Sequence, residues 1–251
     1  MGDEQSKRRL GSGEGEGDIV VCPRIPSANT PMRNKKLQFV FGFVFVYFGI
    51  LIGGFLFKRY GNGSALVADL LSHLVMPVLV FFGLFYRDKK NFAMALDEFK
   101  CTFSSVVVSA ALGLCFALVF LYASQVSIPS IGVVGANAPQ SLLALVTTQY
   151  GVAGVLYLAA SAAVVEELLF KTILIRAIDQ NLTQNRFAVL SALLFVLLHA
   201  TQGPIAIFVI AIYGYLTAVY YFQERRILNL IVLHGVADTL VFLYWGSISR
   251  I

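Results

Sequence analysis

Six ionisable side chains in the second half of the sequence lie within otherwise apolar stretches: Glu166, Glu167, Lys171, His199, His234 and Asp238. Placing a charged side chain at the centre of a membrane helix costs about 2.5–3.5 kcal/mol on insertion scales, so such residues usually have a function. Carboxylates and imidazoles near neutral pH serve as general bases and acids. The set therefore indicates proton-transfer chemistry in an apolar environment.

The two adjacent glutamates must have different roles, because neighbouring side chains on a helix point about 100° apart. Glu167 precedes Lys171 by four residues, which is the favourable order for an ion pair within one helix. This pairing would neutralise Glu167. Glu166 is therefore the predicted general acid or base.

The two histidines follow similar helical spacings. His199 comes four residues after Phe195, so both side chains share one helix face. His234 precedes Asp238 by one helical turn, and Asp238 can accept a hydrogen bond from the imidazole. Counted at 1.5 Å per residue from the nearest basic residue, Glu166 and the two histidines lie roughly 12–20 Å deep and could meet.

The elements that carry these residues are predicted to be transmembrane helices. Hydrophobic residues make up 58% of the 251 residues, charged residues make up 13%, and the mean hydropathy is +0.77. Apolar runs of at least 18 residues recur without the alternation of a membrane barrel. We expect an all-α polytopic bundle of about seven helices around a polar cavity, over 38–57, 65–86, 103–123, 142–165 continuing toward 177, 187–200, 205–222 and 227–246.

Four regions follow from this pattern. Residues 1–36 are polar and predict a flexible tail, and 37–123 form the N-terminal membrane helices. An uncharged outer loop is expected over 124–141, followed by the catalytic helices of 142–251. The mixed segment 91–100 is expected to lie along the interface as an amphipathic helix without chemistry of its own.

The net charge of +5 fits membrane topology better than nucleic-acid binding. Lys and Arg residues gather at the ends of apolar segments, in alternate connections, rather than on a polar face with aromatic residues. This bias predicts a cytoplasmic N-terminus. Cys22, Cys101 and Cys115 lack CxxC spacing and predict neither a disulfide framework nor a zinc ribbon.

Three short motifs occur in order on three apolar segments: E166-E167-L-L-F-K171, F195-V-L-L-H199 and H234-G-V-A-D238. Together they resemble the EExxxR, FxxxH and HxxxN or HxxxD signatures of the CAAX prenyl protease and bacteriocin-processing family of intramembrane proteases. Each motif alone is weak, but the ordered set is specific. The resemblance covers about residues 142–246.

The resemblance implies an intramembrane endopeptidase in a bacterial inner membrane, acting on a membrane-bound protein or peptide. Glu166 would activate the attacking water, His199 would help to position it, and His234 with residue 238 would stabilise the oxyanion. An ionised Asp238 cannot donate a hydrogen bond, so it either orients His234 or is protonated. Lys171 departs from the family arginine, which keeps the charge but loses the bidentate grip on Glu167.

Other functions are compatible with the same residues. One carboxylate and two histidines make a plausible zinc site, although no HExxH motif is present. The primary expectation is that the protein binds no cofactor. The set could also be a structural polar network in a silent scaffold or immunity protein, or a proton relay in a transporter. Asp69 and His73, four residues apart, are expected to satisfy each other.

Overall fold

The computed structural model describes residues 38–49, 75–86, 89–125, 139–177, 182–200 and 204–248. Within these ranges every regular element is helical, which confirms the predicted all-α class. The expected tail over 1–36 lies outside the described residues, as do Asp69 and His73.

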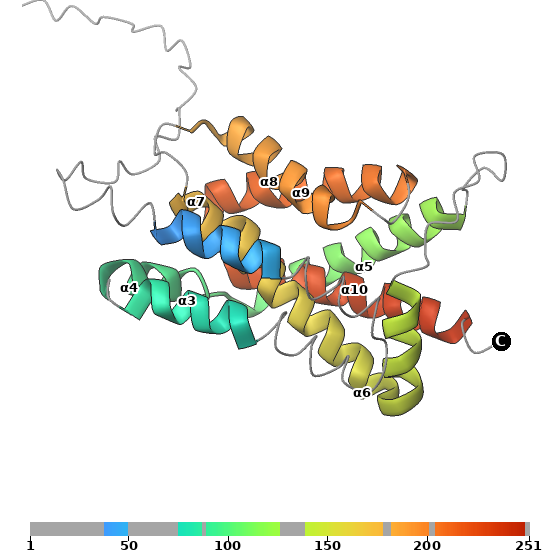
Figure 1. Ribbon diagram of the computed structural model, residues 1–251. Coiled ribbons are helices and arrows are strands. Elements are labelled where there is room, and N and C mark those ends of the chain that lie inside the picture. The colour runs from blue at the N-terminus through green and yellow to red at the C-terminus, as the bar shows by residue number, and fades with distance from the viewer. Residues whose placement is uncertain are drawn as a thin grey trace, which may run out of the picture.

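Apolar helices follow one another along the described chain (Figure 1). Their bounds are Gln38–Gly49, α3 Met76–Tyr86, α4 Lys89–Asp97, α5 Phe103–Gln125, α6 Pro139–Glu167, the π-helix η3 Leu168–Ile173, α7 Leu174–Ala177, α8 Gln184–Leu198, α9 Pro204–Glu224 and α10 Ile227–Ile248. The expected outer loop is shortened at both ends, because α5 extends to Gln125 and α6 begins at Pro139.

Four segments of the described chain are long and apolar enough to cross a membrane: Phe103–Ala123, Tyr150–Ala177, Pro204–Glu224 and Ile227–Ser247. Helix α8 has 15 residues, so it is roughly 22 Å long and shorter than a hydrocarbon layer of about 30 Å. The described residues therefore support an integral membrane protein but do not establish seven spans.

A backbone break divides α6 at Gly151, where φ is 59° and ψ is −140°. Glycine has no Cβ and adopts this left-handed region without the steric cost that other residues meet. The helix restarts in a new direction and continues to the two glutamates, as the bend in α6 shows (Figure 1).

Helix α10 is the centre of the packing around the ionisable residues. It contacts α5, α6, α9 and η3, while α8 packs mainly against α9. A Cβ placed on Gly113 of α5 would lie only 2.3 Å from the Leu233 carbonyl oxygen, so glycine alone permits this approach. Small residues allow membrane helices to pack this closely. The α5–α10 contact thereby sets the position of His234, the next residue along α10.

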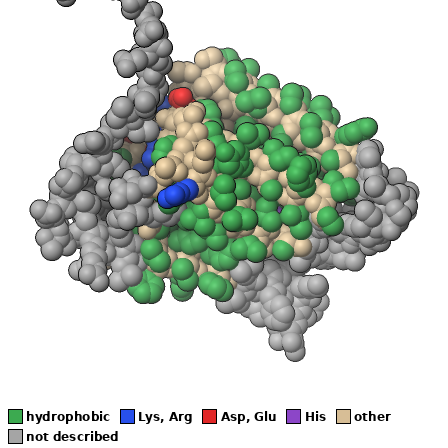
Figure 2. Space-filling model, turned by 90° about the horizontal axis from the view of Figure 1, so that it is seen from above, with side chains coloured by type: hydrophobic (Ala, Val, Ile, Leu, Met, Phe, Trp, Pro, Cys, Tyr) green, Lys and Arg blue, Asp and Glu red, His purple; other side chains and the backbone are tan. Residues whose placement is uncertain are grey.

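The outer surface of the bundle is apolar. Figure 2 shows one face that is covered mostly by hydrophobic side chains, with very few charged groups among the described atoms. Large exposed hydrophobic residues occur on α5, α8 and α9, among them Leu112, Leu118, Leu193, Leu197 and Leu216. Contiguous apolar surface of this kind is typical of a protein in contact with lipid.

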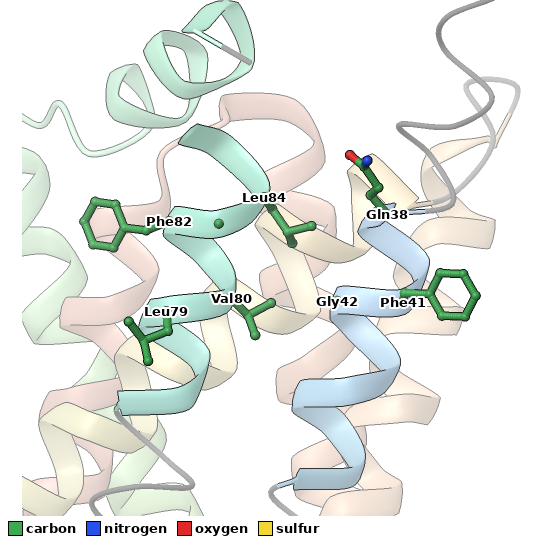
Figure 3. A pocket seen from close by; sticks show the side chains of 8 residues that line it. Gln38, Phe41, Gly42, Leu79, Val80, Phe82 and Leu84 are labelled. Atoms are coloured by element: carbon green, nitrogen blue, oxygen red, sulfur yellow. The ribbon is translucent and has the colours of Figure 1, made fainter. Parts of the chain in front are cut away.

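A groove of about 750 Å³ runs between helix Gln38–Gly49 and α3 (Figure 3). Val80 and Leu84 point toward Gly42, whereas Phe41 and Phe82 point away from the groove on opposite sides. Among the described residues that line it, none is ionisable. The groove is therefore a feature of helix packing and not part of the site described below.

Candidate active site

The two glutamates lie at the end of α6, directly before η3. All six residues of this π-helix are buried. A π-helical turn is wider than an α-helical turn and is often found at functional sites. The change of helical geometry thus occurs where Glu166 and Glu167 enter the interior of the bundle.

Glu167 has three polar partners in the described chain. Its Oε1 atom accepts hydrogen bonds from the Tyr213 hydroxyl at 3.1 Å and from His234 Nδ1 at 2.9 Å. Its Oε2 atom lies 3.7 Å from Lys171 Nζ, and both side chains of this pair are fully buried. The predicted ion pair with Lys171 is present, and the packing of α6 against α10 also brings His234 to the carboxylate.

His234 lies between three carboxylates. Its Nδ1 atom contacts Glu167, its Nε2 atom lies 3.3 Å from Asp238 Oδ2, and the same Nε2 lies 3.8 Å from Glu166 Oε2. An ionised carboxylate accepts hydrogen bonds and cannot donate them. The contact between Glu167 and His234 therefore requires a proton on Nδ1. Nε2 is then the nitrogen that faces both Glu166 and Asp238.

His199 lies at the edge of this cluster, one residue beyond the end of α8. Its Nδ1 donates a hydrogen bond to the Phe195 carbonyl at 2.9 Å, which leaves Nε2 as the acceptor nitrogen of a neutral ring. Among the described residues no hydrogen bond or ion pair joins His199 to the carboxylates or to His234. The Phe195 ring separates the two imidazoles, with centroids 4.8 Å from His199 and 5.9 Å from His234.

Lys171 occupies a fully buried site between helices η3 and α8. Its Nζ donates to the Ser191 hydroxyl at 3.3 Å, and that hydroxyl donates to the Phe170 carbonyl at 3.1 Å. The Phe195 ring lies 5.7 Å from Nζ. The ammonium is therefore held by an anion, a hydroxyl and an aromatic ring, which together compensate for its removal from water.

Ser191 and Tyr213 were not predicted from the sequence. Both are buried polar residues on apolar helices, and such a residue needs a hydrogen-bond partner. The only sign in the sequence was that a polar residue lies within an apolar span. This sign does not identify the hydrogen-bond partner of either residue. Their contacts depend on how α8 and α9 pack against α6 and η3.

A second buried network surrounds Glu98, at the turn after α4. Its carboxylate accepts hydrogen bonds from Arg176 at 2.8 Å, Tyr221 at 2.8 Å and Thr172 at 3.0 Å. Segment 91–100 was expected to be an interfacial amphipathic helix, and within it Glu98 is 5% exposed and pairs with Arg176. The network fixes η3 and α7 to α9.

A metal centre is not supported by the side-chain arrangement. No group of three His, Cys, Asp or Glu side chains in the described ranges is placed to hold a metal ion. The Nδ1 atom of His234 contacts Glu167, and the Nδ1 atom of His199 contacts the Phe195 carbonyl. The steps proposed below use no metal ion.

Residues 147–240 match the family model described as type II CAAX prenyl endopeptidase Rce1-like. This segment of the chain is similar to the Rce1-like family. It spans α6 from residue 147 to α10 and contains all six ionisable residues singled out above. The assignment confirms the resemblance carried by the three motifs and supports an intramembrane endopeptidase of the CAAX type. No curated protein matches the chain, and no solved structure matches it.

Proposed function

We propose that this protein hydrolyses a peptide bond of a membrane-associated protein or peptide, with Glu166 as the general base. One observation carries the choice of base. Glu167 Oε1 already accepts two hydrogen bonds and its Oε2 faces Lys171, whereas Glu166 Oε2 faces Nε2 of His234 at 3.8 Å. A water at hydrogen-bond distance of about 2.7–3.0 Å can contact both of these atoms at once.

The proposed reaction uses this water as the nucleophile. Glu166 takes one of its protons while the water oxygen attacks the scissile carbonyl carbon, giving a tetrahedral oxyanion. Protonated His234 donates from Nε2 to that oxyanion, and Glu167 with Asp238 holds the imidazolium. The C–N bond then breaks, and the proton on Glu166 passes to the leaving amine. His199 Nε2, as the acceptor nitrogen, would help to orient the water.

The protein acting in its own membrane provides the test of this function. In cells that carry Glu166→Ala in place of the parent, we expect one membrane-associated polypeptide to retain a terminal segment that the parent removes. Quantitative comparison of peptide termini by mass spectrometry gives the readout, with Glu224→Ala as the control because this exposed residue lies outside the site. Identical termini in the three strains would favour the transporter or scaffold function.

We further propose that the N-terminus is cytoplasmic and that the protein resides in a bacterial inner membrane. The proposal rests on basic residues in the inner connections, which include Lys35, Lys36, Arg87, Lys89, Lys90, Lys100, Arg186, Arg225 and Arg226.

Cysteine labelling tests this topology. In a background without Cys22, Cys101 and Cys115, a membrane-impermeant reagent should label Ser130→Cys from outside and should label Ser12→Cys only after the membrane is opened. Blocking by an internal quencher provides the control for leakage. Labelling of both positions from outside would contradict the orientation.

A further inference from the structure

Tyr213 donates a hydrogen bond to Glu167 through its hydroxyl group. It lies on α9, is 5% exposed, and its hydroxyl is 3.1 Å from Glu167 Oε1. That oxygen also accepts the hydrogen bond from His234 Nδ1. The tyrosine hydroxyl and the imidazole therefore converge on a single carboxylate oxygen.

The ring of Tyr213 is held firmly by its neighbours. Its centroid lies 4.6 Å from the Phe116 ring, 5.3 Å from the His234 ring and 5.9 Å from the Phe195 ring. Close packing of aromatic rings restricts their rotation. The hydroxyl consequently has a fixed position from which to orient the Glu167 carboxylate.

The orientation of Glu167 sets the orientation of the His234 ring. Oε1 accepts from Nδ1, which directs Nε2 toward Glu166 and Asp238. If the carboxylate rotated, the Nδ1 contact would weaken, and the ring would lose the hydrogen bond that directs Nε2 toward Glu166. A hydrogen bond to one imidazole nitrogen commonly fixes the orientation of the other nitrogen in this way.

We propose that Tyr213 is a positioning residue of the endopeptidase site: its hydroxyl fixes Glu167 and thereby holds the His234 ring with Nδ1 on Glu167 and Nε2 toward Glu166. The inference rests on the proposed function for its effect on catalysis. The effect on His234 itself is independent of any substrate.

The same side chain forms part of a second surface. Tyr213 and Phe116 lie in the wall of a groove of about 490 Å³ between α5, α9 and α10, together with Leu112, Leu216 and Leu233. Tyr213→Phe keeps this wall and the ring contacts and removes only the hydroxyl. The substitution therefore separates the role of the hydrogen bond from that of the groove.

Tyr220→Phe is the matched control. Tyr220 is on the same helix, lines the same groove, and its hydroxyl accepts a hydrogen bond of 2.7 Å from Asn229 Nδ2. A purely structural role of the two hydroxyls predicts similar effects of both substitutions. A positioning role predicts that only Tyr213→Phe changes the site.

In cleavage assays with the full chain in liposomes, Tyr213→Phe should lower kcat about 10–100-fold with little change in KM and a shifted pH profile. Tyr220→Phe should leave kcat and the pH profile unchanged. Equal kcat in Tyr213→Phe and the parent would overturn the proposal.

Imidazole ¹⁵N spectra provide a second readout that needs no substrate. The chain has three histidines, so the His234 signal can be assigned by its loss in His234→Asn. The parent should show a hydrogen-bonded Nδ1–H on His234, and Tyr213→Phe should show a shifted Nδ1 signal or a shifted titration midpoint. An unchanged His234 signal would overturn the proposal even if kcat fell. Because this measurement does not involve cleavage, it distinguishes a failure of the inference from a failure of the proposed function.

Discussion

Replacing Glu166 by Gln is expected to reduce the cleavage rate by about 10²–10⁴-fold, the usual contribution of a general base. Glutamine keeps the shape and can still contact His234, but it cannot take a proton from water at neutral pH. Because the shape and the polar character of the side chain are retained, the melting temperature should change little. Cleavage rate and melting temperature of the purified variant are the measurements.

Glu167→Gln provides the comparison within the same helical turn. Its oxygens hold Tyr213, His234 and Lys171, so the substitution leaves a buried ammonium without its anion. Removing one partner of a buried ion pair costs about 3–5 kcal/mol, and Glu167→Gln should lower the melting temperature far more than Glu166→Gln does. If Glu167→Gln were stable but inactive while Glu166→Gln remained active, Glu167 would be the general base and Glu166 would have the structural role.

Lys171→Ala should have the second large effect. The ammonium is fully buried beside Glu167, and its loss would leave that carboxylate buried without a counter-charge. We expect the free energy of unfolding to fall by about 3–5 kcal/mol and activity to fall with it. Chemical denaturation in detergent and the cleavage rate are the two measurements.

Two further substitutions at this position separate charge from volume. Lys171→Met keeps most of the volume without the charge, and its loss of stability should approach that of the alanine variant. Lys171→Arg keeps the charge and can bind Glu167 through two hydrogen bonds, so it should retain folding and activity. If Lys171→Ala proved as stable and active as the parent, the ion pair would have no role in either.

The contacts that could be predicted from the sequence are those within one helix. Glu167 with Lys171, and His234 with Asp238, are both four residues apart, and helical geometry alone places such side chains together. The contact between Glu167 and His234 spans 67 residues and depends on the crossing of α6 and α10. Patterns of apolar residues predict that two helices exist but not which of their faces meet.

His199 shows where the helical argument reaches its limit. The sequence placed it on a shared face with Phe195, and the two rings do pack, but α8 ends at Leu198. The side chain therefore leaves the helical register and bonds the Phe195 carbonyl. Glu98 was overlooked for a related reason, because its partners Arg176 and Tyr221 follow 78 and 123 residues later.

The central claim is that Glu166 activates the hydrolytic water without a metal ion. Its most direct test is the cleavage rate of a candidate membrane-bound substrate by the parent and by Glu166→Gln, in the same liposomes treated with a chelator and then supplied with zinc. We predict full activity of the parent at each stage and a rate about 10²–10⁴-fold lower in Glu166→Gln. Full activity of Glu166→Gln, or inhibition of the parent by the chelator with rescue by zinc, would contradict the claim.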